Sequence, residues 1–135
     1  MATWLLKTEP SAYSFADLVR DKKAVWDGIR NPEARNNLRA AKKGDLVLVY
    51  HTGDERRVVG LGRITREAYP DPADADWLAV DIAPGRALAE PVTLGELKAE
   101  KKLADFALIR RSRLSVVPVT DAELGVILAL GKTKL

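Results

Sequence analysis

Hydrophobic positions along the chain follow two periods, one typical of strands and one typical of helices. Five apolar runs bounded by turn residues predict strands, at residues 3–8, 45–51, 58–69, 77–82 and 114–119. The run 45–51 is apolar almost without a break, which predicts a strand buried on both faces. The run 114–119 includes Pro118, which indicates an edge strand because proline cannot donate a ladder hydrogen bond.

Segments with apolar residues at helical spacing lie between these runs. Ser14, with Asp17 three residues later, has the pattern of a helix start, and this helix is expected to end near Lys22 and Lys23. Asn31 followed by Pro32 predicts a second start, with Gly44 marking the end of that helix. Two further helices are predicted at 94–101 and from an Asp121 cap through Leu130. Residues 103–109 fit either a helix or a strand.

The glycines at positions 60 and 62 lie on one side of the long predicted strand 58–69. They indicate strong curvature or close approach of another segment, since glycine has no side chain to obstruct it. The pattern as a whole predicts an α+β fold, a small curved mixed β-barrel of five or six strands with three or four helices packed outside. We expect a single domain over residues 1–135.

Composition narrows the chemistry. The chain is 47% hydrophobic and 30% charged, as in an ordinary globular domain, and it has no cysteine and one histidine. Disulfides and thiol chemistry are therefore excluded, and neither a metal site nor a cofactor is expected. No run has the length of a signal peptide or a membrane helix, so a cytoplasmic, intracellular protein without a membrane partner is expected.

Charge is unevenly distributed although the formal net charge is only +3. Residues 22–43 contain seven lysines and arginines against two acidic residues, whereas residues 68–135 contain nine against ten. Within the second helix, Arg35 and Arg39 are four residues apart and therefore lie on one face. This face is a candidate contact for an anionic partner such as nucleic acid, and the alternative is a solvated helix surface. Its apolar stripe is mostly alanine, too thin for a membrane-surface helix.

The segment Trp26–Asn31 has the residue types of a base-binding loop. Trp26 could stack on a base, and the side chains of Asp27 and Asn31 could bond its edge. A tryptophan in the core is the alternative.

Two strand ends offer similar groups. Tyr50, His51 and Thr52 close the main buried strand, and the alternative for them is a core tyrosine with a surface histidine. Lys7 closes the first strand, where a solvated pair with Glu9 is the alternative.

Enzyme motifs are absent from the chain. It has no Gly-x-Ser-x-Gly nucleophile elbow, no phosphate-binding loop, no dinucleotide fingerprint and no paired-histidine metal motif. Lys7 with Glu9 could transfer a proton inside a closed pocket, and this remains the enzymatic alternative.

Several of these segments, in this order, closely resemble the EVE domain. They are Trp4–Pro10, Trp26–Asn31, Ala34–Asn36, Gly44–Asp45, Tyr50–His51, Tyr69–Asp71 and Leu114–Val116 with Pro118. The resemblance runs nearly end to end. It implies a PUA-like barrel related to YTH and ASCH domains, and a nucleic-acid-binding module for a modified base, expected to be a modified cytosine in DNA, flipped into an aromatic pocket.

The resemblance also implies which residues form the site. The base pocket would be lined by Lys7, Pro10, Trp26, Asp27, Asn31, Tyr50, His51 and Thr52, and the nucleic-acid backbone would be contacted by Arg30, Arg35, Asn36 and Arg39. Thr52 stands where serine is usual in the family, and Ile29 where valine is usual; the extra methyl at Thr52 could narrow the pocket. A reader of modified RNA and a small ASCH-type enzyme acting on modified nucleosides or bases remain the alternatives to a DNA reader.

Overall fold

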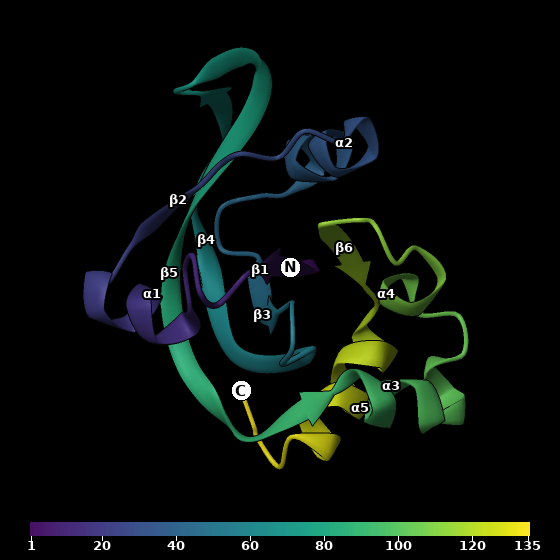
Figure 1. The fold of residues 1–135 in the computed structure, drawn as a ribbon. Coiled ribbons are helices and arrows are strands. Elements are labelled where there is room, and N and C mark those ends of the chain that lie inside the picture. Colours follow the sequence, from purple (N-terminus) through teal and green to yellow (C-terminus); the bar gives the residue numbers. More distant parts are fainter.

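Six strands form one curved sheet in the computed structural model, which describes residues 1–135 (Figure 1). They are β1 (Thr3–Thr8), β2 (Ala24–Trp26), β3 (Leu46–His51), β4 (Arg57–Asp71), β5 (Asp74–Thr93) and β6 (Val116–Val119). Their order across the sheet is β2-β5-β4-β3-β1-β6. β1 and β3 are parallel and every other neighbouring pair is antiparallel, so the sheet is mixed, as predicted.

Five α-helices and one 3₁₀ turn cover the sheet and its ends. They are α1 (Phe15–Asp21), α2 (Pro32–Ala40), α3 (Leu94–Ala99), α4 (Ala107–Arg110), α5 (Asp121–Leu130) and the 3₁₀ turn η1 (Lys101–Leu103). The α+β class is therefore confirmed. The structure has one α-helix more than predicted, because the ambiguous stretch 103–109 ends in the short helix α4.

Three helix boundaries differ from the prediction. Helix α3 ends at Ala99, two residues before the predicted end at Lys101. Helix α2 ends at Ala40, not at Gly44, because Ala41 takes up an extended conformation and packs into the core. The Asp45 side chain accepts a hydrogen bond from the Lys42 amide and holds the following residues in a turn. Helix α5 is capped by Thr120, and Asp121 is its first residue. The predicted caps Ser14 and Asn31 are confirmed, since each accepts a hydrogen bond from the first turn of its helix.

Strand β5 extends to Thr93, far beyond the 77–82 run that the sequence predicted. Its second half pairs with the glycine-containing part of β4, where the register shifts around residues 60 and 62. A Cβ atom at Gly60 would overlap the Phe15 ring, and one at Gly62 would lie 2.7 Å from the Ala83 carbonyl oxygen. Both glycines therefore permit a close approach, as their spacing predicted.

The core is one cluster of 33 buried residues on the sheet and the inner faces of its helices. All six residues of β3 are buried, which confirms the prediction for that strand. β6 lies at the edge of the sheet with Pro118 exposed, also as predicted. The parallel pair β1–β3 ends at Thr8 and His51, side by side, and the candidate site lies at this end.

Candidate functional site

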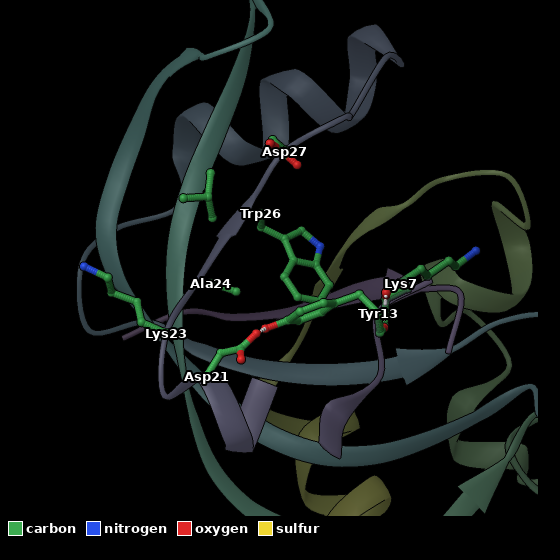
Figure 2. A pocket seen from close by; sticks show the side chains of 9 residues that line it. Lys7, Tyr13, Asp21, Lys23, Ala24, Trp26 and Asp27 are labelled. Atoms are coloured by element: carbon green, nitrogen blue, oxygen red, sulfur yellow. Dashed lines mark hydrogen bonds between the residues drawn. The ribbon is translucent and has the colours of Figure 1, made fainter. Parts of the chain in front are cut away.

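A cavity of about 410 Å³ opens beside the end of β1, between the end of α1 and strand β2 (Figure 2). Its volume lies in the range of small-molecule pockets, about 300–1,000 Å³. The residues that line it come from the end of β1, the turn after it, the last residue of α1, and the segment 23–27 that contains β2: Lys7, Thr8, Tyr13, Asp21, Lys23, Ala24, Val25, Trp26 and Asp27. We call this space the aromatic cavity.

Two aromatic rings form one corner of the aromatic cavity. The Tyr13 and Trp26 ring centroids are 6.1 Å apart and their planes meet at 81°, an edge-to-face arrangement that Figure 2 shows directly. Trp26 is 8% exposed and belongs to the core, whereas Tyr13 is half-buried. The indole is thus fixed by packing, and the Tyr13 ring is the more accessible of the two surfaces.

Hydrogen bonds hold Tyr13 at this corner. The Thr8 hydroxyl donates to the Tyr13 carbonyl oxygen over 2.6 Å, which fixes the turn after β1. The Tyr13 hydroxyl donates to a carboxylate oxygen of Asp21 over 2.9 Å. Burial and this hydrogen bond raise the pKa of Tyr13 to about 12, so the phenol stays protonated at neutral pH. The cavity therefore presents an aromatic face next to an ionised carboxylate.

The loop after β2 is tied to the hairpin between β4 and β5. Gly28 adopts a φ of 74°, the left-handed conformation that favours glycine, and its amide donates to Asp71 over 3.0 Å. Arg30 also donates to Asp71, over 3.0 Å, and the Asp71 side chain is almost fully buried. Hydrogen bonds from the amides of Gly28 and Ala73 and from Arg30 lower the pKa of Asp71 to about 2. This ionised carboxylate anchors the loop that contains Asp27.

A second cavity of about 210 Å³ adjoins the first, and Lys7 lines both. Its other lining residues are Tyr50, Thr52, Gly53, Arg56, Leu94, Leu108 and Ser112. The Lys7 amine donates to the Ser112 carbonyl oxygen over 2.9 Å, and burial lowers the pKa of Lys7 from its ordinary value. We call this space the cationic cavity, because it has two cationic side chains and no carboxylate in its lining.

The structure divides the predicted pocket residues into three groups. Lys7, Trp26 and Asp27 line the aromatic cavity, and Tyr50 and Thr52 join Lys7 in the cationic cavity. The remaining three line neither cavity: Pro10, Asn31 and His51. Pro10 lies in the turn after β1, and the Asn31 side chain accepts the Ala34 amide as the cap of α2.

His51 has a supporting position. Its Nε2 atom accepts a hydrogen bond from the Phe15 amide over 3.0 Å, and its Nδ1 atom lies 2.9 Å from a carboxylate oxygen of Glu55. Accepting at Nε2 requires the proton on Nδ1, so the ring donates to Glu55. The buried imidazole thus joins the end of β3 to the first turn of α1.

The four predicted backbone contacts lie on α2 and the loop before it. The Arg35 guanidinium lies 4.8 Å from the centroid of the Trp77 ring and donates to the Asp76 carbonyl oxygen, and the Arg30 guanidinium lies 5.8 Å from the same ring. Arg39 and Asn36 are exposed and hydrogen-bonded to each other. The two arginines of the helix face therefore differ: Arg35 is packed against β5, while Arg39 faces solvent.

Sequence reasoning missed Tyr13, Asp21 and Lys23 as cavity residues. Tyr13 is a single aromatic residue in a polar turn, and that turn is held by a hydrogen bond from the Thr8 hydroxyl to the Tyr13 carbonyl oxygen, which no local pattern reveals. Asp21 and Lys23 were assigned to a helix end, where charged residues are common. One available signal was that all three lie between two segments already singled out, Lys7–Pro10 and Trp26–Asn31.

The proposed proton-transfer pair is not assembled. The Lys7 amine donates to the Ser112 carbonyl oxygen, while the Glu9 carboxylate accepts from the amide and hydroxyl of Ser11. Each group is occupied by a different partner, and no ion pair joins them. Separately, no helix has both the length and the apolar character that crossing a membrane requires.

Comparison with known proteins gives a consistent result. The EVE domain matches residues 2–130. Thymocyte nuclear protein 1 of Mus musculus is 34% identical over 97% of this chain and 74% of its own length, and that of Homo sapiens is 32% identical over 94% and 72%.

Solved structures agree with the sequence comparison. A Rhodopseudomonas palustris protein superposes with a TM-score of 0.92 at 42% identity, covering 98% of this chain and 94% of its own. Human THYN1 in complex with DNA containing 5-methylcytosine superposes with a TM-score of 0.92 at 30% identity, covering both chains fully. An ASCH protein from Zymomonas mobilis shares the fold at 13% identity and a TM-score of 0.59, over 95% of this chain and 94% of its own.

Proposed function

Since this chain belongs to the EVE domain family, we propose that it binds nucleic acid and receives one modified base, a modified cytosine in DNA, in the aromatic cavity. The observation that supports this most is the corner formed by Tyr13 and Trp26 beside charged side chains, in a cavity of about 410 Å³. The relative human THYN1 was solved with DNA containing 5-methylcytosine.

The polar groups of the aromatic cavity suit a cytosine edge. Cytosine has an amino group that donates hydrogen bonds and a carbonyl oxygen that accepts them. The carboxylate of Asp27 can accept from the amino group. Thymine has no amino group at that position, so the same carboxylate would be left facing its carbonyl oxygen. The cavity therefore favours cytosine over thymine.

The free energies involved indicate that affinity and base selectivity come from different contacts. Extruding a base costs a few kcal/mol, and stacking it on one aromatic ring returns about 1–3 kcal/mol. These terms nearly cancel, so affinity comes from contacts with the backbone and falls steeply with salt. One buried methyl group stabilises by about 0.8 kcal/mol, which is about a fourfold preference. A modification with a polar group can give sharper discrimination, since buried polar groups of the cavity accept or reject it.

Filling the aromatic cavity tests the proposal. Ala24 lines it from β2, and Ala24→Leu would occupy space that the base needs while leaving Tyr13 and Trp26 in place. Ala16→Leu is the matched control, because Ala16 is exposed on α1 and lines neither cavity. Dissociation constants would be measured by fluorescence anisotropy for duplexes that differ in one 5-methylcytosine.

We expect the wild type and the Ala16→Leu protein to prefer the methylated duplex, and the Ala24→Leu protein to bind both duplexes alike with the affinity of the unmodified one. A wild type without any preference for a modified cytosine would contradict the proposed function, and so would a preference that survives in Ala24→Leu. An RNA probe of the same sequence, run in parallel, distinguishes a DNA reader from an RNA reader.

A further inference from the structure

Resting on the proposed function, we infer that the cationic cavity receives a phosphate group of the nucleic-acid strand, the one adjacent to the base held in the aromatic cavity. The inference assigns a second subsite and adds Arg56, which no sequence pattern singled out, to the residues that contact nucleic acid. It follows from the charge of the cationic cavity, the free guanidinium of Arg56 and the position of Lys7 between the two cavities.

The linings of the two cavities differ in charge. The aromatic cavity has two aspartates in its lining, beside Lys23 and the shared Lys7. The cationic cavity has Lys7 and Arg56, three hydroxyl groups and no carboxylate: the hydroxyls belong to Tyr50, Thr52 and Ser112. Cations with hydroxyl donors are the groups that bind phosphate oxygens in proteins. An anion therefore suits the cationic cavity, while a neutral base suits the aromatic one.

Arg56 has no partner within the protein. Its side chain makes no hydrogen bond or ion pair, whereas the neighbouring Arg57 pairs with Glu55 over 3.1 Å. The Arg56 backbone has a φ of 45°, a left-handed conformation that is unfavourable for a residue with a side chain. A hydrogen bond from the Leu94 amide to the Arg56 carbonyl oxygen holds this conformation over 2.8 Å.

Arg56 and Tyr50 both line the cationic cavity. Burial raises the pKa of Tyr50, and the positive charge of Arg56 opposes that increase, so the charge acts on the interior of the cavity. On the β1 side, the Glu9 carboxylate lies next to Gly53 and accepts hydrogen bonds from Ser11 and, over 3.5 Å, from the Thr52 hydroxyl. On the opposite side, Glu55 is occupied by His51 and Arg57, and Asp54 lines a neighbouring cavity together with Arg56 without pairing with it. No carboxylate lines the cationic cavity itself.

Lys7 connects the two cavities. In the parallel pair β1–β3 it lies opposite Tyr50, and its side chain lines both spaces. Figure 2 shows its amine directed away from Asp21, and the amine's hydrogen-bond partner is the uncharged carbonyl of Ser112. A nucleotide with its base beside Tyr13 would thus place an attached phosphate within reach of a lysine whose charge is not compensated.

A neutral linkage at one phosphate tests the inference. A duplex with one modified cytosine would be made with a methylphosphonate, which has no charge, at either linkage flanking that nucleotide. Each duplex would be titrated with the wild type, Arg56→Gln and the control Arg86→Gln. Arg86 is exposed on β5 and lines neither the aromatic nor the cationic cavity.

We expect one of the two neutral linkages to weaken binding by about tenfold for the wild type and for Arg86→Gln, the effect of removing one charge-assisted hydrogen bond. The same linkage should change the affinity of Arg56→Gln by less than about twofold, because that variant no longer has the guanidinium that binds the phosphate. If each neutral linkage weakens binding of Arg56→Gln by the same factor as it weakens binding of the wild type, the inference is wrong. The modification preference of the wild type, read on the unaltered duplexes, tests the proposed function separately.

Inorganic phosphate provides a test without nucleic acid. In a nuclear magnetic resonance titration, phosphate should shift the amide signals of Gly53 and Arg56 in the wild type, and these shifts should disappear in Arg56→Gln. Shifts confined to other parts of the chain, or none, would overturn the inference. The inference would also be overturned if phosphate shifted these signals while the neutral linkages affected the wild type and Arg56→Gln equally. That result would indicate a site for free phosphate and not for a nucleic-acid strand.

Discussion

Arg30 and Asp71, 41 residues apart in the sequence, meet in an ion pair of 3.0 Å, and the same carboxylate accepts the Gly28 amide. This pair joins the loop after β2 to the hairpin between β4 and β5. Because Trp26 and Asp27 precede that loop directly, the position of one wall of the aromatic cavity depends on a carboxylate that lies outside the cavity.

The first prediction concerns acid stability. The pKa of Asp71 is about 2 in the folded protein, below its ordinary value of 3.8. A carboxyl with a depressed pKa stabilises the fold at a pH above its unfolded value, and this contribution is lost as the pH falls through the folded value. Asp71 therefore contributes up to about 2 kcal/mol above pH 4, and the contribution disappears between about pH 4 and pH 2.

Urea unfolding at neutral pH and near pH 2 measures this contribution. Asp71→Asn should lower the free energy of unfolding at neutral pH and have little effect near pH 2. Asp105→Asn is the control, because Asp105 is 95% exposed in its pair with Arg110 and should change stability little at either pH. An equal loss in Asp71→Asn at both values would show that ionisation is not the source of the effect.

A second prediction concerns the two arginines of α2, Arg35 and Arg39. Arg35→Gln with Arg39→Gln should weaken binding to modified and unmodified duplexes by the same factor, since phosphate contacts contain no information about the base. The slope of log K against log salt should become less steep by about 0.9 for each phosphate that the variant no longer neutralises. An unchanged slope would place the backbone contacts elsewhere on the surface, and a changed preference for the modified duplex would connect this face to base selection.

The third prediction concerns the Tyr13 hydroxyl. Burial raises its pKa first, and the hydrogen bond to Asp21 raises it further, to about 12. Asp21→Asn removes the charge but not the burial, so the pKa should fall part of the way towards 10. Carbon-13 signals of the tyrosine rings, followed as the pH is raised, measure this shift. A pKa that stays at about 12 in the variant would mean that Asp21 does not act on the phenol.

The fourth prediction concerns Gly60. A methyl group at this position would overlap the Phe15 ring, so Gly60→Ala should destabilise the protein by about 1–3 kcal/mol. Gly125→Ala is the matched control: Gly125 lies in α5 with open space around it, and alanine there should stabilise the helix by about 1 kcal/mol. Chemical unfolding of both variants gives the comparison. A neutral Gly60→Ala would show that α1 and β4 can separate without cost.

Local patterns predicted the elements whose signals are local. The caps Ser14 and Asn31 were predicted because each cap residue lies next to the helix it begins. The buried strand, predicted at 45–51 and found at Leu46–His51, was predicted because its apolar run is nearly unbroken. The second half of β5 was not, because its residues are mostly polar or exposed and their pairing with β4 is a long-range contact.

The same division between local signals and long-range contacts holds for the candidate site. Lys7, Trp26 and Asp27 were predicted and line the aromatic cavity, since each lies at or beside a strand end. Tyr13 reaches the cavity because the turn after β1 folds back onto Thr8, and the sequence contains no sign of that hydrogen bond. His51 has the residue type of a binding group, but the structure uses both of its ring nitrogens to join β3 to α1 and the turn after β3.

The most direct test of base entry into the aromatic cavity is the fluorescence of 2-aminopurine placed next to the modified cytosine in a duplex. This base analogue is quenched by stacking and becomes bright when its neighbour leaves the helix. Saturating wild-type protein should raise the fluorescence on the modified duplex, and the Ala24→Leu protein should bind without raising it. Saturated binding of the wild type with no rise in fluorescence would contradict the account, because the base would then have been read inside the helix.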